Sequence, residues 1–326
     1  MGKKIYYLVA VFVVGAVIGW NTQGAAQTFT LRMAFQTPDP DTPIYVTGVK
    51  FKQSVEQKSN GRIKVELYPG GVLGDQLALV SGVRTGAIDM GIMVGWSLAT
   101  VEPSLVLPDL PFLFNNVESA RKLLDGPAGK KMLSYLDPKG VKGLAWSELG
   151  FRGIIGNKRI QTAADVKGVK IRVVENPLYL ATWRAAGANP VPLAQGEVYL
   201  ALKQGAIDAV DTNYEAFYGQ KFYEASSYMA VTDHMYTAAV IGINLPRFNA
   251  LPPDLQKVVL EAAEDAKLES WAKAQNLEQR AKQVVQQYVK EVTYPDKTAF
   301  RQIMQKVYKE YEAAVGKDLL DLAGVK

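Results

Sequence analysis

The sequence contains no cysteine and a single histidine, His234. Without cysteine there can be no disulfide framework, no thiolate nucleophile and no cysteine-based metal site. A serine-hydrolase triad is not favoured either, because the Gly-x-Ser-x-Gly motif is absent. His234 stands at the start of an apolar strand, where a structural histidine is the better interpretation. The sequence therefore offers little support for an enzyme.

Long apolar runs are also scarce, and the one that stands out lies at residues 5–20. Lys3 and Lys4 precede it and small residues offer a cleavage site before Gln27, which predicts a secretory signal peptide over residues 1–26. The alternative is a retained anchor helix, but about 16 apolar residues are fewer than the roughly 20 needed to span a bilayer. Export without disulfides indicates the periplasm of a Gram-negative bacterium.

Charge of one sign is not concentrated anywhere in the chain. The formal net charge is +5 over 326 residues, and no long block of like charge or nucleic-acid-binding motif occurs. Nucleic acid is therefore not an expected partner. With 48% hydrophobic residues, the chain has enough apolar material for about two packed domains.

Strand and helix patterns alternate along the first part of the chain and then recur. The first set comprises strands at 28–35, 63–68 and 90–95 and helices at 44–58 and 76–85. The second comprises a strand at 168–174, helices at 177–186 and 197–204, and a strand from 207. The tetrapeptide Gly-Ala-Ile-Asp joins a helix to a strand at 86–89 and again at 205–208. Two similar α/β lobes are therefore predicted.

The boundary between the lobes is predicted near Leu149, just after a strand at 143–146. The first lobe then comprises residues 27–149 and about 239–278, and the second comprises 150–238 and about 279–326. A long helix is predicted at about 253–292, since neither Gly nor Pro occurs from residue 254 to 292 and apolar residues recur at helical spacing. Such a helix is too long for one lobe. It either crosses both lobes or is two helices joined by an unmarked bend.

Arg172 lies in the middle of the strand predicted at 168–174. Burying a guanidinium without a partner costs several kcal/mol. At the edge of a cleft between two lobes, its partner is a ligand carboxylate, which matches the planar guanidinium bidentately. In the alternative interpretation Arg172 reaches solvent or pairs with Glu175 or Asp208. Periodicity leaves both open.

Several spaced runs point to one family. They are RVVENP at 172–177, GANPVPL at 187–193, EVYLALKQG at 197–205, DTN at 211–213, QKFYE at 220–224, YP at 68–69, LGD at 73–75 and LPPDLQKVV at 251–259. In this order they resemble the solute receptors of tripartite ATP-independent periplasmic (TRAP) transporters, the family named for its C4-dicarboxylate members. The resemblance covers essentially the whole mature chain.

The resemblance implies a two-lobed, type II-like periplasmic binding fold of the α/β class, with a long helix spanning both lobes and no cofactor. In such receptors the arginine at the position of Arg172 pairs with the ligand carboxylate, and the one at Arg152 assists. The asparagine at Asn213 hydrogen-bonds the ligand or holds the first arginine. For Arg152 the alternative is a solvated surface position, which its apolar neighbours disfavour.

Departures from the family pattern concern the remaining wall of the cleft. Gln195 stands where relatives often carry an aromatic residue, while Gln36 and Trp96 end strands of the first lobe. Ligands of open α/β sheets bind at such strand ends, although Trp96 would serve equally as core. Glu175 completes the predicted ligand-binding set. Glu175 and Asp211 are also the carboxylates considered for a cation bound with the ligand.

The predicted function is a non-enzymatic periplasmic receptor. It binds a small organic acid through an arginine–carboxylate clamp and delivers it to two integral membrane TRAP subunits. Only one carboxylate clamp is visible, so a monocarboxylic hydroxy, keto or aromatic acid stands beside a dicarboxylate. The alternatives are the binding protein of an ATP-driven importer and a periplasmic enzyme acting on organic acids.

Overall fold

The computed structural model describes residues 27–325. The predicted signal peptide at 1–26 lies outside the described residues. Within residues 27–325, no helix combines the length and apolar character required to cross a membrane.

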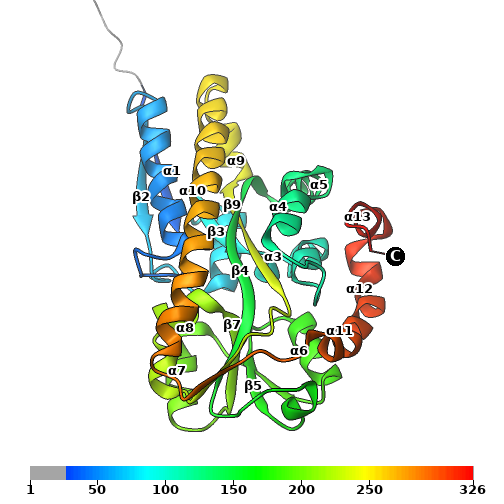
Figure 1. The fold of residues 1–326 in the computed structure, drawn as a ribbon. Helices are drawn as coiled ribbons and strands as arrows, with labels where there is room; N and C mark the ends of the chain where they lie inside the picture. The colour runs from blue at the N-terminus through cyan, green and yellow to red at the C-terminus, as the bar shows by residue number, and fades with distance from the viewer. Residues whose placement is uncertain (1–26, 326) are drawn as a thin grey trace, which may run out of the picture.

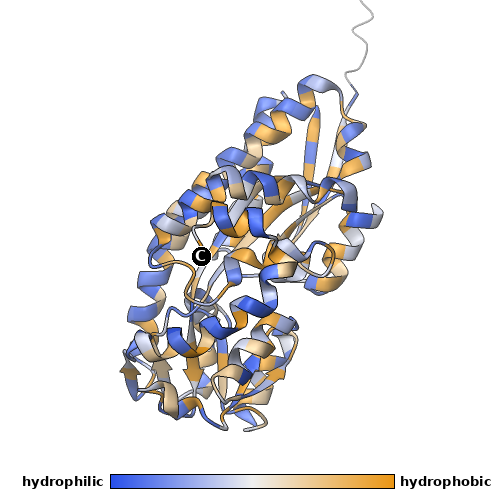
Figure 2. Ribbon diagram, turned by 90° about the vertical axis from the view of Figure 1, so that its right-hand side faces the viewer, coloured by the Kyte–Doolittle hydropathy of each residue, from blue (hydrophilic) through white to orange (hydrophobic). Residues whose placement is uncertain are grey.

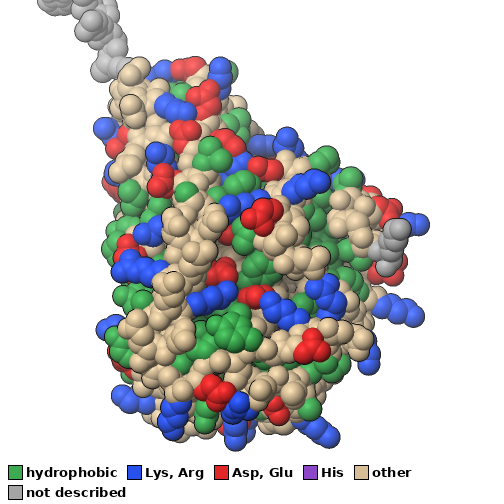
Figure 3. All heavy atoms as spheres, in the orientation of Figure 1, with side chains coloured by type: hydrophobic (Ala, Val, Ile, Leu, Met, Phe, Trp, Pro, Cys, Tyr) green, Lys and Arg blue, Asp and Glu red, His purple; other side chains and the backbone are tan. Residues whose placement is uncertain are grey.

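On the face drawn in Figure 3, basic and acidic side chains are interspersed rather than gathered by sign.

Ten strands form one mixed sheet in the described part of the chain. They are β1 (Phe29–Ala34), β2 (Ile63–Tyr68), β3 (Met90–Val94), β4 (Val141–Gly156), β5 (Lys170–Val173), β6 (Asn189–Pro192), β7 (Ala209–Asn213), β8 (Tyr228–Ala230), β9 (Tyr236–Asn244) and β10 (Glu291–Thr293). The order β2-β1-β3-β9 on one side is repeated as β6-β5-β7-β4 on the other. In each half three parallel strands are followed by one antiparallel strand. We call the β2-β1-β3-β9 side the first lobe and the other side the second lobe.

Helices cover the sheet, as Figure 1 shows. They are α1 (Pro43–Lys58), α2 (Gln76–Thr85), α3 (Gly95–Leu98), α4 (Val117–Asp125), α5 (Pro127–Ser134), α6 (Pro177–Ala185), α7 (Val198–Lys203), α8 (Tyr214–Gly219), α9 (Leu245–Asn249), α10 (Pro253–Gln286), α11 (Lys297–Met304), α12 (Tyr308–Val315) and α13 (Lys317–Leu322). The predicted α/β class is confirmed. Local chemistry fixes many ends: α2 begins where the Asp75 side chain accepts from the Ala78 amide, and it ends at Gly86 in the left-handed conformation.

The repeated Gly-Ala-Ile-Asp segments have the same structural role in both lobes. Gly86 and Gly205 adopt positive φ after α2 and α7. The carboxylates of Asp89 and Asp208 each accept a hydrogen bond of 2.9 Å from a backbone amide of the adjacent parallel strand, β1 and β5 respectively. Each repeat therefore turns the chain out of a helix and joins two parallel strands.

The predicted lobe boundary falls inside a continuous strand. β4 runs for 16 residues and pairs with β9 up to Phe151 and with β7 from Arg152 onward. Its register shifts between Glu148 and Gly150, where Gly150 has a φ of 88°. The lobes are thus joined by a shared strand that carries a bulge at the crossing.

The long helix α10 is continuous over 34 residues, or about 51 Å at roughly 1.5 Å per residue. It packs along α1 and β4 and also on α8, where Lys282 lies 4.0 Å from the Tyr214 ring centroid. It therefore contacts both lobes, as predicted (Figure 1). The helix ends earlier than expected, because the residues around Val292 form β10 and pair with β8.

The C-terminal helices touch elements of both lobes. Helix α11 packs on α6 of the second lobe, whereas α12 packs on the 3₁₀ segment η1 (Pro103–Asp109) and α13 on α5. The predicted domain division assigned this whole segment to the second lobe. That division stays a prediction, and the contacts place the segment against both lobes.

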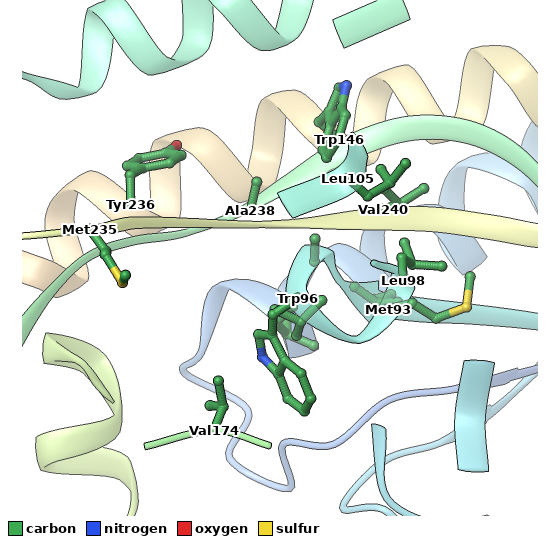
Figure 4. Packing of buried hydrophobic residues seen from close by; sticks show 14 of the residues in the cluster. Met93, Trp96, Leu98, Leu105, Trp146, Val174, Met235, Tyr236, Ala238 and Val240 are labelled. Carbon is green, nitrogen blue, oxygen red and sulfur yellow. The ribbon is translucent and has the colours of Figure 1, made fainter. Parts of the chain in front are cut away.

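The apolar core fills the space between the sheet and its helices. Along the central strands the residues are largely hydrophobic, whereas the outer helices alternate hydrophilic and hydrophobic stretches (Figure 2). Trp146 of β4 and Val240 of β9 are both buried beside Leu105 (Figure 4). Trp96 of the first lobe and Val174 of the second both belong to this buried cluster, so the packing reaches the boundary between the lobes (Figure 4).

Gly156 is required where β4 crosses β7. A Cβ atom at this position would lie 2.4 Å from the Asp208 carbonyl oxygen and 2.5 Å from the Ala209 Cα, both of which are backbone atoms that cannot rotate away. We expect Gly156→Ala to lower the free energy of unfolding by about 1–3 kcal/mol or more. Gly196→Ala, which meets nothing within 4 Å, is the control. Equal urea midpoints for the two variants would contradict this account.

Candidate solute-binding cleft

A cavity of about 120 Å³ lies between the lobes. A water needs only roughly 10–15 Å³ of such volume, so the cavity is large enough for a small organic molecule. Its wall includes all seven predicted ligand-binding residues: Gln36, Trp96, Arg152, Arg172, Glu175, Gln195 and Asn213. The seven residues that the sequence analysis selected thus come from both lobes and line one cavity. Whether they touch a ligand stays a prediction.

Arg172 is buried in β5 with an exposed fraction of 2%. Its Nε and Nη2 donate to the Leu193 carbonyl oxygen at 3.0 and 2.7 Å. Its Nη1 is buried and has no hydrogen-bond partner among residues 27–325. Burial, followed by the charge of Arg152, lowers the pKa of Arg172 to about 10, so the side chain remains a cation at neutral pH. One donor on the cavity wall is therefore left over.

The alternative partners of Arg172 are not used. No ion pair joins it to Glu175 or Asp208 among the described residues, and the Asp208 carboxylate instead accepts from the Lys170 amide. Glu175 lies on the cavity wall. Arg172 is thus a buried charge without an ion-pair partner among the described residues. The charges of Asp211 and Glu175 act on it only from a distance, so its burial remains costly unless a ligand supplies an anion.

Arg152 differs from Arg172 because other groups of the protein already accept most of its hydrogen bonds. Its Nε lies 2.7 Å from Asp211 Oδ1, and its Nη2 donates to the Asp211 carbonyl oxygen at 2.8 Å. Nη1 makes only long contacts, 3.4 Å to Asn213 Oδ1 and 3.3 Å to Thr237 Oγ1. Burial lowers the pKa of Arg152 and the charge of Asp211 raises it, with the balance above its ordinary value. Only Nη1 has spare capacity toward the cavity.

Asp211 is enclosed by donors. Trp183 Nε1 donates to Oδ2 at 2.7 Å, and His234 Nε2 lies 3.2 Å from Oδ1 beside the Arg152 contact. Burial raises the pKa of Asp211, but the charge of Arg152, and then that of His234, hold it well below the usual range. Because both carboxylate oxygens are occupied, Asp211 has none to offer the cation considered from the sequence. No cluster of three or more metal-binding side chains occurs in the described part of the chain.

Two other predicted residues, Asn213 and Gln36, also have hydrogen-bond partners within the protein. Asn213 donates to the Gly150 carbonyl oxygen at 2.8 Å and accepts from Arg152, so it holds Arg152 rather than Arg172. Gln36 donates to the Gly74 carbonyl oxygen. These bonds fix the orientation of both amides on the cavity wall.

The match to a known family settles the class of protein. A family model described as bacterial extracellular solute-binding protein, family 7 (DctP) matches residues 35–314. The chain belongs to this family. It is a TRAP periplasmic solute-binding protein, and the predictions of family, periplasmic location and absence of enzymatic activity are confirmed.

Named relatives and solved structures agree along most of the chain. The 2,3-diketo-L-gulonate-binding periplasmic protein YiaO of Escherichia coli is 33% identical over 258 residues, 79% of this chain and 78% of its own. The TRAP solute-binding protein of Roseobacter denitrificans with bound β-D-glucuronate is 30% identical, with a TM-score of 0.86 over 91% of this chain and 98% of its own. The one from Polaromonas bound to D-erythronate is 28% identical, with a TM-score of 0.87 over 91% and 99%.

Two hydrogen bonds between the lobes were not foreseen for this TRAP protein. Asn176 Nδ2 donates to the Trp96 carbonyl oxygen at 2.8 Å, and the Tyr179 hydroxyl donates to Asp109 Oδ1 at 2.6 Å. The Tyr179 ring also lies 4.8 Å from the Arg152 guanidinium. Asp109 has no local sequence signal, because its role depends on a partner 70 residues away. These contacts hold α6 against the first lobe behind the cavity.

Glu215 is the main cleft residue that the sequence analysis missed. It lies in the first turn of α8 and lines the cavity. Burial, followed by the negative charge of Asp39, raises the pKa of Glu215 to about 7. Its place two residues after Asn213, at the end of a strand, was the available signal.

Asp109 makes the stability of the fold depend on pH. Burial raises its pKa from 3.8 to about 7, so between these values the folded state keeps a proton that the unfolded state releases. Its contribution to the free energy of unfolding is therefore complete below about pH 4 and is lost as the pH rises to about 7, by at most about 4 kcal/mol. Asp109→Asn removes this loss while keeping an acceptor for Tyr179.

We expect Asp109→Asn to be closest in stability to the unsubstituted protein at about pH 4 and increasingly more stable as the pH rises to 8, as measured by urea unfolding. Asp211, whose pKa is lowered on folding, loses its contribution to the free energy of unfolding only below about pH 4, and it does so equally in both proteins. A variant that is less stable by the same amount at both pH values would contradict the assignment.

Proposed function

We propose that this protein binds a small organic acid, of the sugar-acid or hydroxy-acid class, through Arg172 and delivers it to the membrane subunits of a TRAP transporter. The observation that carries the proposal is the buried Arg172 Nη1, which has no partner among residues 27–325 although the side chain lines the cavity. A ligand carboxylate supplies both the missing acceptor and the missing negative charge.

The energetics favour a carboxylate over a neutral group at this position. A hydrogen bond between a guanidinium and a carboxylate is about twice as strong as a neutral one and is short, about 2.7–2.9 Å. Leaving the buried cation unpaired costs free energy in the empty receptor. Binding of an anion removes that cost, so part of the affinity is built into the fold of the empty receptor.

Arg152 provides a second, weaker contact in this proposal. Its Nη1 is held by Asn213 and Thr237 only at 3.3–3.4 Å, distances at which a carboxylate oxygen competes readily. Its other nitrogens stay with Asp211. Arg172 is thus the main carboxylate donor, and Arg152 is an assisting donor whose first role is structural.

The remaining wall supports a hydroxylated acid. Amide and hydroxyl side chains from both lobes line the cavity: Gln36, Thr37, Gln195, Thr212, Gln220 and Thr237. A few polar groups placed in this way fix the orientation of a ligand through its hydroxyls. Two of the solved relatives carry hydroxylated monocarboxylates, β-D-glucuronate and D-erythronate, whereas a 28% identical relative from Rhodobacter capsulatus is named for C4-dicarboxylates. Membership of the family implies delivery of the ligand to two membrane subunits.

The test of the carboxylate contact is Arg172→Ala, titrated by calorimetry with sugar acids and hydroxy acids. We expect binding to weaken by about 2–5 kcal/mol, as for removal of one partner from a buried charge pair. Arg159→Ala is the control, because Arg159 is an exposed arginine of the same lobe that pairs with Glu291. Unchanged affinity in the Arg172 variant contradicts the proposal.

Substitutions of the two arginines should have different effects on the free energy of unfolding when no ligand is bound. Arg152→Met leaves the Asp211 charge buried without its main partner, so we expect a loss of about 3–5 kcal/mol in the free energy of unfolding. Arg172→Met removes a buried cation that forms no ion pair with any described residue, so the loss in the free energy of unfolding should be much smaller. Urea unfolding of both variants checks this, and equal losses would mean that Arg172 is paired within the protein.

A further inference from the structure

We infer that Glu215 is a specificity-determining residue that accepts hydrogen bonds from an uncharged, hydroxyl-bearing part of the ligand and excludes a second carboxylate. This inference rests on the proposed function, in which Arg172 binds the first carboxylate. It narrows the ligand to a hydroxylated monocarboxylic acid.

The position of Glu215 places it opposite an acidic loop of the first lobe. Glu215 follows β7 in the first turn of α8, and Gly219 lies one helical turn further along the same helix. A Cβ atom on Gly219 would be 3.2 Å from Asp39 Oδ2. Glu215 and Gly219 both line the cavity. This side of α8 therefore faces the cavity and the loop that carries Asp39.

No cation in the described part of the chain neutralises this acidic end of the cavity. Within residues 27–325, neither Glu215 nor Asp39 takes part in an ion pair, and the nearby Asp41 is paired with Lys273 outside the cavity wall. Among the residues that the structure describes, the only cations on the cavity wall are Arg152 and Arg172. Arg152 is already bound to Asp211.

The cavity is therefore electrically asymmetric. Arg172, on β5, attracts one carboxylate, whereas a second carboxylate near Glu215 would meet the negative charges of Glu215 and Asp39, which no cation among the described residues neutralises. A hydroxyl group instead donates to a Glu215 oxygen, whether that carboxyl group is ionised or protonated. Burial and the charge of Asp39 raise the pKa of Glu215 to about 7, which agrees with a carboxylate that lacks a positive partner.

Two pairs of acids test the inference, because the members of each pair differ only in the far end. They are D-gluconate with D-glucarate, and D-erythronate with meso-tartrate. Calorimetry should give the unsubstituted protein at least a tenfold preference for the monoacid in whichever pair fits the cavity. Glu215→Gln replaces the carboxylate by an amide that can donate to a second carboxylate, so this preference should fall at least tenfold.

Asp39→Asn is a second variant that keeps Glu215 and should lower the preference in the same direction by a smaller factor. Glu197→Gln is the matched control: it removes one negative charge from an exposed residue of the same lobe that does not line the cavity, and it should leave the preference unchanged. Urea unfolding verifies that each variant is folded.

Any one of three outcomes would overturn the inference. The first is that the unsubstituted protein binds the diacid as tightly as the monoacid, and the second is that folded Glu215→Gln keeps the original preference. The third is that Glu197→Gln changes the preference as much as Glu215→Gln does. In all three the proposed function still stands if Arg172→Ala abolishes binding. Binding of no acid in either pair overturns the proposed function, and this inference with it.

Discussion

The free donor of one buried guanidinium is the constraint on which this account depends. Two nitrogens of Arg172 donate to the Leu193 carbonyl oxygen, and Nη1 has no acceptor among residues 27–325. A fold that served only its own stability would place an acid there or an apolar side chain, because an unpaired buried charge is among the most costly features of a protein interior. The cost is tolerated because the position lies on the wall of a cavity between two lobes, where a ligand can enter and supply the anion. Binding and stability are thus coupled through one side chain.

The surrounding structure keeps Arg172 free by satisfying its neighbour. Arg152 and Asp211 are paired with each other, so the carboxylate of Asp211, whose charge also acts on Arg172, already has a partner. The same β4 strand that carries Arg152 passes from one lobe to the other through a bulge at Gly150, and α10 contacts both lobes. Tyr179 and its bond to Asp109 add a direct link behind the cavity. The cleft is therefore built on continuous elements, which position the donors of the two lobes relative to one another.

Much of the fold follows from local signals, and the errors have long-range causes. Helix α2 has the predicted bounds of 76–85 because an aspartate caps its start and a glycine ends it. The continuity of β4 was missed because the polar Ser147 and Glu148 interrupt its apolar pattern; both are buried, and Ser270 of α10 contacts them. The early end of α10 reflects pairing of β10 with β8, to which no local pattern points. Around the cleft, family motifs identified seven residues from both lobes. Asp109 depends on Tyr179 in the other lobe and the setting of Glu215 depends on Asp39, and neither Asp109 nor Glu215 belongs to a motif.

The most direct measurement is a crystal structure of the protein with the acid that it binds most tightly. The account predicts a ligand carboxylate oxygen within about 2.7–2.9 Å of Arg172 Nη1, with the Arg152–Asp211 pair intact beneath it. A ligand whose carboxylate lies elsewhere in the cleft, with Arg172 turned toward an acid of the protein itself, would contradict the central claim.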